Sequence, residues 1–173
     1  MTTTDVIELY KLFQENGITV WIDGGWGVDA LLEKQTRPHK DLDVAIQEKD
    51  LPKFRELLEA RNYKDIKLEE ARPHNFVLAD YKEHEIDVHV LVLDEKGNGV
   101  YGPPEDGQIY PASSLAGEGR IDGIEVNCIS AEDMVKFHSG YELNEKDYKD
   151  ISALCEKFGI PLPEEYKKFR PSL

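Results

Sequence analysis

The chain has 173 residues, of which 40% are hydrophobic and 32% are charged, and its net charge is −14. This length and composition predict one compact globular domain and exclude a largely disordered chain. The acidic balance argues against a nucleic-acid partner, and no apolar run reaches the length of a membrane span. Metal ions and amine-bearing small molecules suit such a surface better.

Cysteine usage and the N-terminal residues bear on the compartment. Cys128 and Cys155 lack the spacing of a metal site, so we expect two reduced, buried thiols. The first five residues do not resemble a signal peptide. The sequence therefore predicts a cytoplasmic protein.

Apolar spacing and helix-breaking residues predict the elements of the first half of the chain. They are a helix over residues 4–16 capped by Thr4, a strand over 18–22, a helix over 26–33, a strand over 41–46, and a helix over 50–61 capped by Asp50. Residues 34–40 are polar, contain Pro38 and are expected to form a loop.

The second half is predicted to add more strands and then helices. They are strands over 63–68, 75–80, 85–93 and 124–129, and helices over 130–140 and 144–159, with a Gly/Pro-rich loop over 94–107. This order favours an α/β (α+β) fold, a mixed β-sheet with packed helices. We divide it into residues 1–128 and a C-terminal helical segment, 129–173, packed on them.

Asp41 and Asp43 are the strongest sign of chemistry. Residues two apart on a strand face the same side, so both carboxylates stand together while Leu42 turns to the core. Like charges this close are unfavourable unless a cation lies between them. Mg²⁺ is the natural cation, because it takes oxygen ligands and bridges carboxylates to phosphates.

A third carboxylate, Asp87, lies on the later strand, on the face opposite Ile86 and Val88. His89 shares its face. If this strand lies beside the Asp41 strand, three carboxylates meet. Such a set could hold metal and also activate a hydroxyl nucleophile.

Gly24 and Gly25 stand where the first strand turns into a helix, which lets the backbone approach a phosphate. Arg37, His39 and Lys40 are the nearest positive groups available for a triphosphate. Each feature alone has a plain structural interpretation, as a turn or a solvated side chain. Their ordered combination favours a nucleotide site.

At these residues the chain resembles the DNA polymerase β-type nucleotidyltransferases, and most of all the lincosamide nucleotidyltransferases. The motifs that carry the resemblance are Trp21-Ile22-Asp23-Gly24-Gly25-Trp26-Gly27-Val28-Asp29, Lys34-Gln35-Thr36-Arg37-Pro38-His39-Lys40-Asp41-Leu42-Asp43, Cys128-Ile129-Ser130, Phe137-His138-Ser139-Gly140-Tyr141, Asp147 and Asp150-Ile151. The resemblance spans roughly residues 5–155. Agreement is poor over 63–80 and 94–122, which we expect to shape the acceptor pocket.

The resemblance implies a nucleotidyltransferase fold, a Mg²⁺–ATP site and a homodimer. It assigns Asp41 and Asp43 to the metal, and Asp87 as a third metal ligand or the general base. It further assigns Gly24, Gly25 and Arg37 to the triphosphate, and we add His39 to the nucleotide site because of its position just before the aspartate pair. The acidic stretch with Glu142, Glu145, Asp147 and Asp150 is typical of a solvated helix surface, with attraction of a cationic drug or a partner subunit as the alternative.

The implied reaction moves a nucleoside monophosphate, AMP in the first instance, from an NTP to a hydroxyl of a small-molecule antibiotic and releases pyrophosphate. The motifs favour a lincosamide acceptor. The net charge of −14 favours a polycationic aminoglycoside modified at its 2″ position. A non-antibiotic acceptor, as in toxin-type relatives, and a non-catalytic nucleotide-binding module remain as alternatives.

Overall fold

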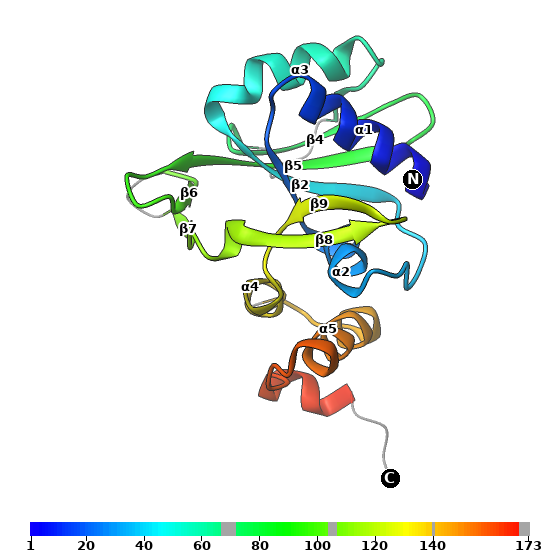
Figure 1. Cartoon of the computed structure of the whole chain (residues 1–173), viewed down its shortest axis with the longest axis vertical. Helices are drawn as coiled ribbons and strands as arrows, with labels where there is room; N and C mark the ends of the chain where they lie inside the picture. Colours follow the sequence, from blue (N-terminus) through cyan, green and yellow to red (C-terminus); the bar gives the residue numbers. More distant parts are fainter. Residues whose placement is uncertain (67–71, 104–106, 140, 170–173) are drawn as a thin grey trace.

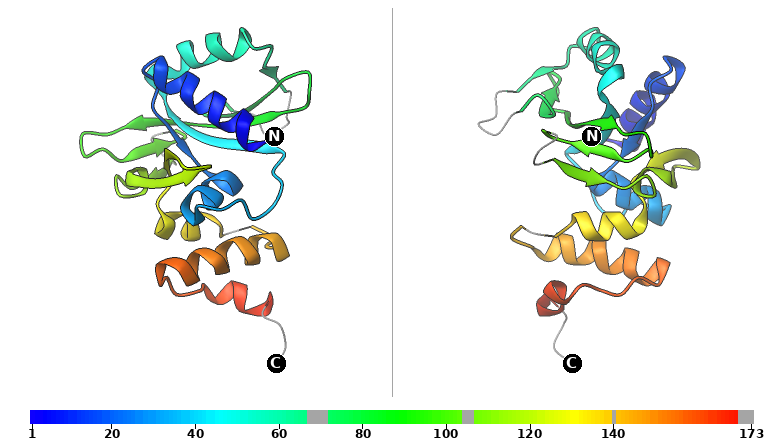
Figure 2. Two further views of the ribbon diagram at one scale, coloured as in Figure 1. Left: turned by 45° about the vertical axis from the view of Figure 1, so that its right-hand side comes forward. Right: turned by 90° about the vertical axis from the view of Figure 1, so that its left-hand side faces the viewer.

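A computed structural model describes residues 1–66, 72–103, 107–139 and 141–169. One mixed sheet crosses the middle of the molecule, with α1 (Thr3–Glu15) and α3 (Leu51–Glu59) on one face (Figure 1). The other face carries α2 (Gly24–Leu32), α4 (Ala131–Phe137) and α5 (Glu145–Phe158), as the two turned views also show (Figure 2). The predicted mixed sheet with packed helices is confirmed.

Nine strands of the described residues form this sheet. They are β1 (Val20–Ile22), β2 (Asp41–Gln47), β3 (Lys64–Asp65), β4 (Asn75–Ala79), β5 (Glu85–Leu93), β6 (Gly99–Tyr101), β7 (Gln108–Tyr110), β8 (Gly117–Ile121) and β9 (Ile124–Cys128). Their main order is β3-β4-β5-β2-β1-β9-β8, and β6 and β7 extend from one end of β5. The central β2 and β5 run parallel, and β1 runs antiparallel to β2.

The cap of the first helix lies two residues before the predicted one. Thr2 is the N-cap: its side chain accepts from Asp5 N, and Asp5 accepts in return from Thr2 N. This reciprocal pair satisfies two free helix donors, which explains why Thr4 is not the cap. The prediction for Asp50 is correct in position only, since its side chain makes no capping bond.

Short strands are where the predictions fail. Residues 94–107 do not form a loop throughout, because Gly99–Tyr101 is β6 and pairs with β5 and with β7. The strand β8 was not predicted. Its Gly119 packs so closely on α2 that a Cβ atom there would lie 2.6 Å from the backbone of Ala30. Glycine in a strand removes the apolar signal that sequence patterns need. Part of the predicted 63–68 strand lies outside the described residues.

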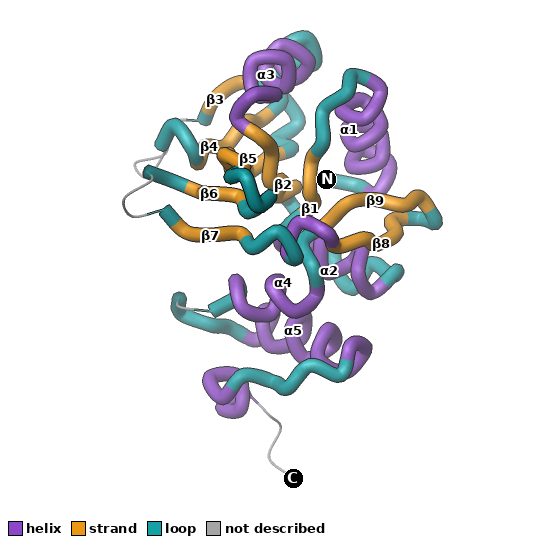
Figure 3. Tube along the Cα trace, turned by 60° about the vertical axis from the view of Figure 1, so that its left-hand side comes forward, coloured by secondary structure: helices purple, strands orange, loops and turns teal. Residues whose placement is uncertain are grey.

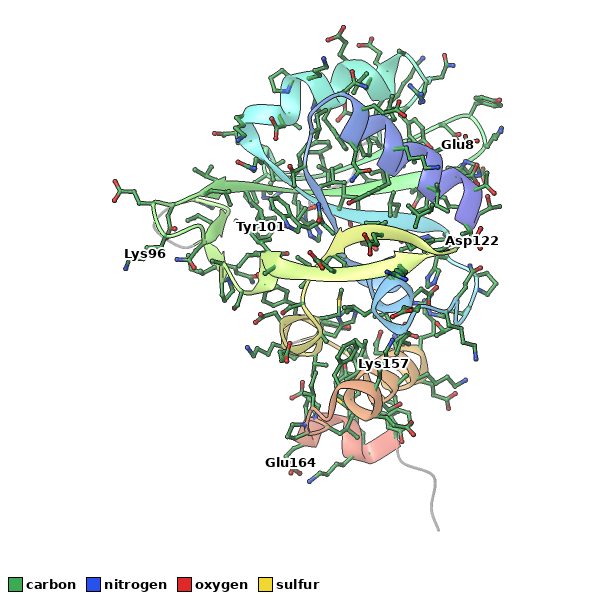
Figure 4. All side chains as sticks on the ribbon, in the orientation of Figure 1. Glu8, Lys96, Tyr101, Asp122, Lys157 and Glu164 are labelled. Atoms are coloured by element: carbon green, nitrogen blue, oxygen red, sulfur yellow. The ribbon has the colours of Figure 1, made fainter. Side chains whose placement is uncertain are left out.

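The C-terminal helices pack directly beneath α2. Lys157 Nζ donates to the Leu31 carbonyl at 2.8 Å, and Lys157 lies between α5 and α2 in Figure 4. Tyr166 OH donates to the His138 carbonyl at 2.5 Å and ties the end of the chain to α4. The division at residue 128 stays a prediction. In the described part of the chain, no helix is long and apolar enough to cross a membrane.

Candidate active site

The two aspartate-bearing strands lie side by side. In the parallel register of β2 and β5, Asp43 stands opposite Asp87. Leu42 and Ile86 are buried beneath them, so the carboxylates lie on the other face of the sheet. The two strands are neighbours, which is the condition under which three aspartates meet at one place.

The turn from β1 into α2 presses against this cluster. Asp23 caps α2, and its backbone N–H donates to the Asp43 carbonyl at 2.9 Å. Gly24 adopts a positive φ of 55°, and a Cβ atom there would overlap Asp43 Oδ2. Only glycine fits this conformation and this contact, so the backbone at the start of α2 lies directly beside the carboxylate.

A cleft with a volume of about 480 Å³ opens over these groups. Asp23, Gly24, Asp43 and His89 line its floor, which is built on the sheet. The other lining residues come from the β6–β7 hairpin and the end of α4: Tyr101, Gln108, Tyr110, Lys136, Phe137, His138, Ser139 and Tyr141. Tyr101 lies where the hairpin meets the sheet (Figure 4). In the Cα trace, β7 is the strand of the hairpin nearer to α4 (Figure 3).

The carboxylates of the cleft are poorly compensated. Burial, with the charges of Asp41 and Asp23, raises the pKa of Asp43 from 3.8 to about 7. Burial also raises the pKa of Asp87, although His89 opposes this effect. Asp87 Oδ1 is buried and has no hydrogen-bond partner. A buried acceptor without a donor is costly, and a ligand in the cleft would satisfy it.

His89 is the nearest cationic group to the aspartates. Its Nδ1 lies 3.8 Å from Asp23 Oδ2, and its Nε2 lies 3.7 Å from Asp87 Oδ1. Burial disfavours the charged ring, but Asp23 outweighs it and raises the pKa of His89. In the same way, burial of Asp23 is outweighed by His89, which lowers the pKa of Asp23. His89 thus balances Asp23; it also opposes the raised pKa of Asp43, but burial and the neighbouring carboxylates outweigh it.

The donor set fits a hard divalent cation. The side chains of the aspartate cluster offer oxygen ligands, as a hard cation requires. The unpartnered Asp87 oxygen and the raised pKa of Asp43 are both features that a bound cation would relieve. Among the described residues, however, no group of three or more His, Cys, Asp or Glu side chains is arranged to hold a metal ion unaided. This suits Mg²⁺, which is usually bound by one or two carboxylates together with substrate phosphates.

His39 is not a free positive group, contrary to the sequence interpretation. Arg37 Nη1 donates to His39 Nδ1 at 2.9 Å. Because a guanidinium only donates, this bond fixes the ring proton on Nε2, which donates to Asp29 Oδ2 at 2.5 Å. His39 is buried, and both its nitrogens are engaged, so its ring holds the loop before β2 and has no donor left for a phosphate.

Arg37 and Asp150 also differ from the simple expectation. Arg37 donates to Asp150 Oδ2 through Nε at 3.1 Å and through Nη2 at 2.8 Å. Asp150 is buried and is not part of a solvated helix surface. A Cβ atom on Gly25 would lie 3.0 Å from Arg37 Nη2, so the guanidinium covers the first turn of α2.

Sequence reasoning gave two acidic residues, Asp23 and Asp150, no part in the site. Asp23 had a readable signal, because it immediately precedes a helix, in the N-cap position. Asp150 had a weaker one: it falls on the apolar stripe of α5, with Ile151 and Leu154. Tyr101 and Tyr110 had none, because neither β6 nor β7 was predicted.

A glycine turn beside a strand Asp-x-Asp, with a third aspartate on the neighbouring strand, defines this molecule as a nucleotidyltransferase fold. The crystal structure of ANT(2″)-Ia in complex with adenylyl-2″-tobramycin shares that fold, with a TM-score of 0.71 at 20% identity over 96% of this chain and 92% of that one. The lincomycin-bound crystal structure of the lincosamide antibiotic adenylyltransferase LnuA has a TM-score of 0.79 at 30% identity, over 93% of this chain and 99% of that one.

Sequence comparison extends from the fold to the family. The family model described as aminoglycoside-2″-adenylyltransferase matches residues 5–154. A lincosamide resistance protein of Staphylococcus haemolyticus is 32% identical over 89% of this chain and 94% of its own length. The chain therefore belongs to this family of antibiotic nucleotidyltransferases, as its motifs predicted.

Proposed function

We propose that this protein transfers AMP from ATP to a hydroxyl group of a lincosamide, in a reaction that depends on Mg²⁺ and releases pyrophosphate. The observation that carries the proposal is the position of Asp43, which lines the cleft beside Gly24, shares its strand face with Asp41 and stands opposite Asp87 on the neighbouring strand. The lincosamide resistance protein, which matches along most of its length, supports the acceptor class.

The residues take distinct roles in this proposal. Asp41 and Asp43 hold Mg²⁺, which when bound offsets phosphate charge and makes the acceptor hydroxyl more acidic. The backbone at Gly24 and Gly25 and the side chain of Arg37 contact the triphosphate. His39 supports them by holding Arg37.

The bond changes are those of a single displacement. The acceptor oxygen forms a bond to the α-phosphorus, and the bond from that phosphorus to the bridging oxygen breaks, so that pyrophosphate leaves. As general base, Asp87 receives the hydroxyl proton; its raised pKa makes it a better base than an ordinary carboxylate. As a third metal ligand, Asp87 would leave that proton to solvent.

A second candidate acceptor is an aminoglycoside. The family model carries that description, and the cleft floor is acidic through Asp23 and Asp43. An acidic floor attracts polyamines more strongly than a drug with one amine. Both acceptors use the same chemistry at the same carboxylates.

Mass spectrometry of reaction mixtures tests the proposal. Purified protein is incubated with MgCl₂, ATP or GTP, and one of lincomycin, clindamycin or several aminoglycosides. We expect a mass gain of one AMP on a lincosamide, and its loss when EDTA is added. An adduct on aminoglycosides alone would select the second candidate. A folded protein that binds ATP but modifies none of the drugs would refute an antibiotic acceptor. The homodimer and the cytoplasmic location stay predictions.

A further inference from the structure

A chain of hydrogen-bonded side chains connects α5 to α2. Asp150 on α5 accepts from Arg37, Arg37 donates to His39, and His39 donates to Asp29 on α2. Asp29 Oδ1 in turn accepts from Thr36 N at 2.9 Å and from Thr36 Oγ1 at 2.7 Å. The loop between α2 and β2 is therefore held by two carboxylates, Asp29 from α2 and Asp150 from α5.

Arg37 is the member of this chain that is open to solvent. Its side chain is 28% exposed, whereas that of Asp150 is 6% exposed. Asp150 and His39 engage Nε and one N–H on each of Nη1 and Nη2. A guanidinium carries five N–H donors. One N–H on each terminal nitrogen therefore remains for an anion, and Nη2 already lies above Gly25.

We propose that Asp150 is a positioning residue for the nucleotide, which fixes the Arg37 guanidinium over the first turn of α2 so that its remaining donors meet the triphosphate. The inference rests on the proposed function and deepens it, because it gives the C-terminal helical segment a part in binding ATP. Asp150 offsets some of the charge of Arg37, so its contribution is geometric. A preorganised guanidinium loses less side-chain entropy when it binds phosphate.

Charge makes such positioning valuable here. ATP is anionic, the chain has a net charge of −14, and the cleft floor is acidic. An arginine side chain has many rotamers, so in so acidic a protein Arg37 could pair with many different surface carboxylates. The buried Asp150 acts from a rigid helix of 14 residues and selects one of those arrangements.

The first test measures ATP binding by calorimetry, with MgCl₂ and without acceptor, for wild type and Asp150→Asn. We expect the variant to bind ATP about tenfold more weakly, because the Arg37 guanidinium is no longer held in place for its charge-assisted contact with the triphosphate. In turnover, KM for ATP rises and KM for the acceptor stays within about twofold. Equal or tighter ATP binding by a folded Asp150→Asn protein would overturn the proposal.

A double-mutant cycle separates positioning from general structure. In an Arg37→Ala background, Asp150→Asn is expected to change ATP affinity less than about twofold, because Asp150 acts only through Arg37. A tenfold effect that persists in that background would show a structural role and reject the proposal. Glu156→Gln, an exposed acid on the same helix, is the matched control and leaves ATP affinity unchanged.

A measurement on the wild-type protein covers the case in which the variants fail to fold. The NMR signal of the Arg37 Nε–H, protected by Asp150, is expected to persist when ATP is added. Its exchange with water in the ATP-bound protein would mean that Arg37 leaves Asp150, which contradicts the proposal. These readouts need no acceptor, so failure to modify any drug would refute the acceptor alone. A wild type that binds no ATP would refute both.

Discussion

Two groups of buried carboxylates in this molecule differ in whether they have hydrogen-bond partners. Asp29 and Asp150, the paired carboxylates, are buried against His39 and Arg37 at hydrogen-bonding distance. Asp43, which lines the cleft, and Asp87, which stands opposite it on the neighbouring strand, are the open carboxylates: no described residue pairs with them at such a distance, and burial raises the pKa of each. A protein satisfies the buried charges that hold its structure and leaves unsatisfied those that await a ligand.

The difference arises from position on the fold. The paired carboxylates project from helices toward the polar loop of residues 34–40, which supplies cationic and ring N–H donors. The open carboxylates stand opposite each other on parallel strands, where the register forces like charges together. Four changes test this contrast, beginning with the largest effect.

Asp43→Asn should nearly abolish nucleotidyl transfer. Removing a metal-binding carboxylate at the reacting centre is expected to lower kcat about a thousandfold, which corresponds to about 4 kcal/mol. Because the variant also removes a buried like charge, its metal-free form should unfold at the same temperature as wild type or higher. Rates of adduct formation and thermal melts check both. Asp65→Asn, at an exposed ion pair with Arg55, is the control; turnover that stays unchanged in Asp43→Asn would refute the mechanism.

Gly24→Ala should lower the rate of nucleotidyl transfer, because a side chain at this backbone position would displace the carboxylate of Asp43. The added methyl would overlap Asp43 Oδ2 and would sit at a φ of 55°, so we expect transfer to fall about a hundredfold. Gly123→Ala separates the two causes, because Gly123 has a φ of 76° and open space around it. Both variants should lose about 1 kcal/mol of stability from backbone strain. If both lost activity equally, the contact with Asp43 would be irrelevant.

Asp29→Asn should damage stability, in contrast to Asp43→Asn. Asp29 accepts hydrogen bonds from Thr36 and His39, and it is buried. Weakening these charge-assisted bonds is expected to lower the free energy of unfolding by about 2 kcal/mol, measured by urea denaturation. An Asp29 variant as stable as wild type would remove the distinction between the two groups.

The last change is in pH, on which stability should depend. The pKa of Asp43 is raised in the folded protein, so between pH 3.8 and about 7 the native state keeps a proton that the unfolded chain has released. The contribution of Asp43 to stability therefore falls as pH rises through this window. With EDTA present, we expect the melting temperature of Asp43→Asn minus that of wild type to grow across it, by about 3 °C for each kcal/mol.

Added Mg²⁺ provides the complementary measurement. Because the cation competes with the proton on Asp43, Mg²⁺ should raise the melting temperature of wild type more at pH 8 than at pH 5. Asp43→Asn should lose most of this response. A response of equal size at both pH values would contradict a raised pKa at the cation site.

The sequence by itself determined the chemistry of the site. Period-two alternation placed Asp41 and Asp43 on one face of their strand and Asp87 on a second strand, and the Gly24–Gly25 pair predicted a turn that a phosphate could approach. These are local signals, since each depends on residues within one element. The same locality explains why the long helices and the central strands were predicted to within a few residues.

Only the tertiary structure decided which charges are open and which are paired. Arg37 and Asp150 are 113 residues apart, and nothing in either local pattern predicts their hydrogen bond. His39 precedes the strand of Asp41 and Asp43 and was predicted to contact the nucleotide, yet its hydrogen bond to Asp29 engages its ring. The identity of a side chain gives its possible partners, but long-range packing selects the partner, and that selection separates a catalytic charge from a structural one.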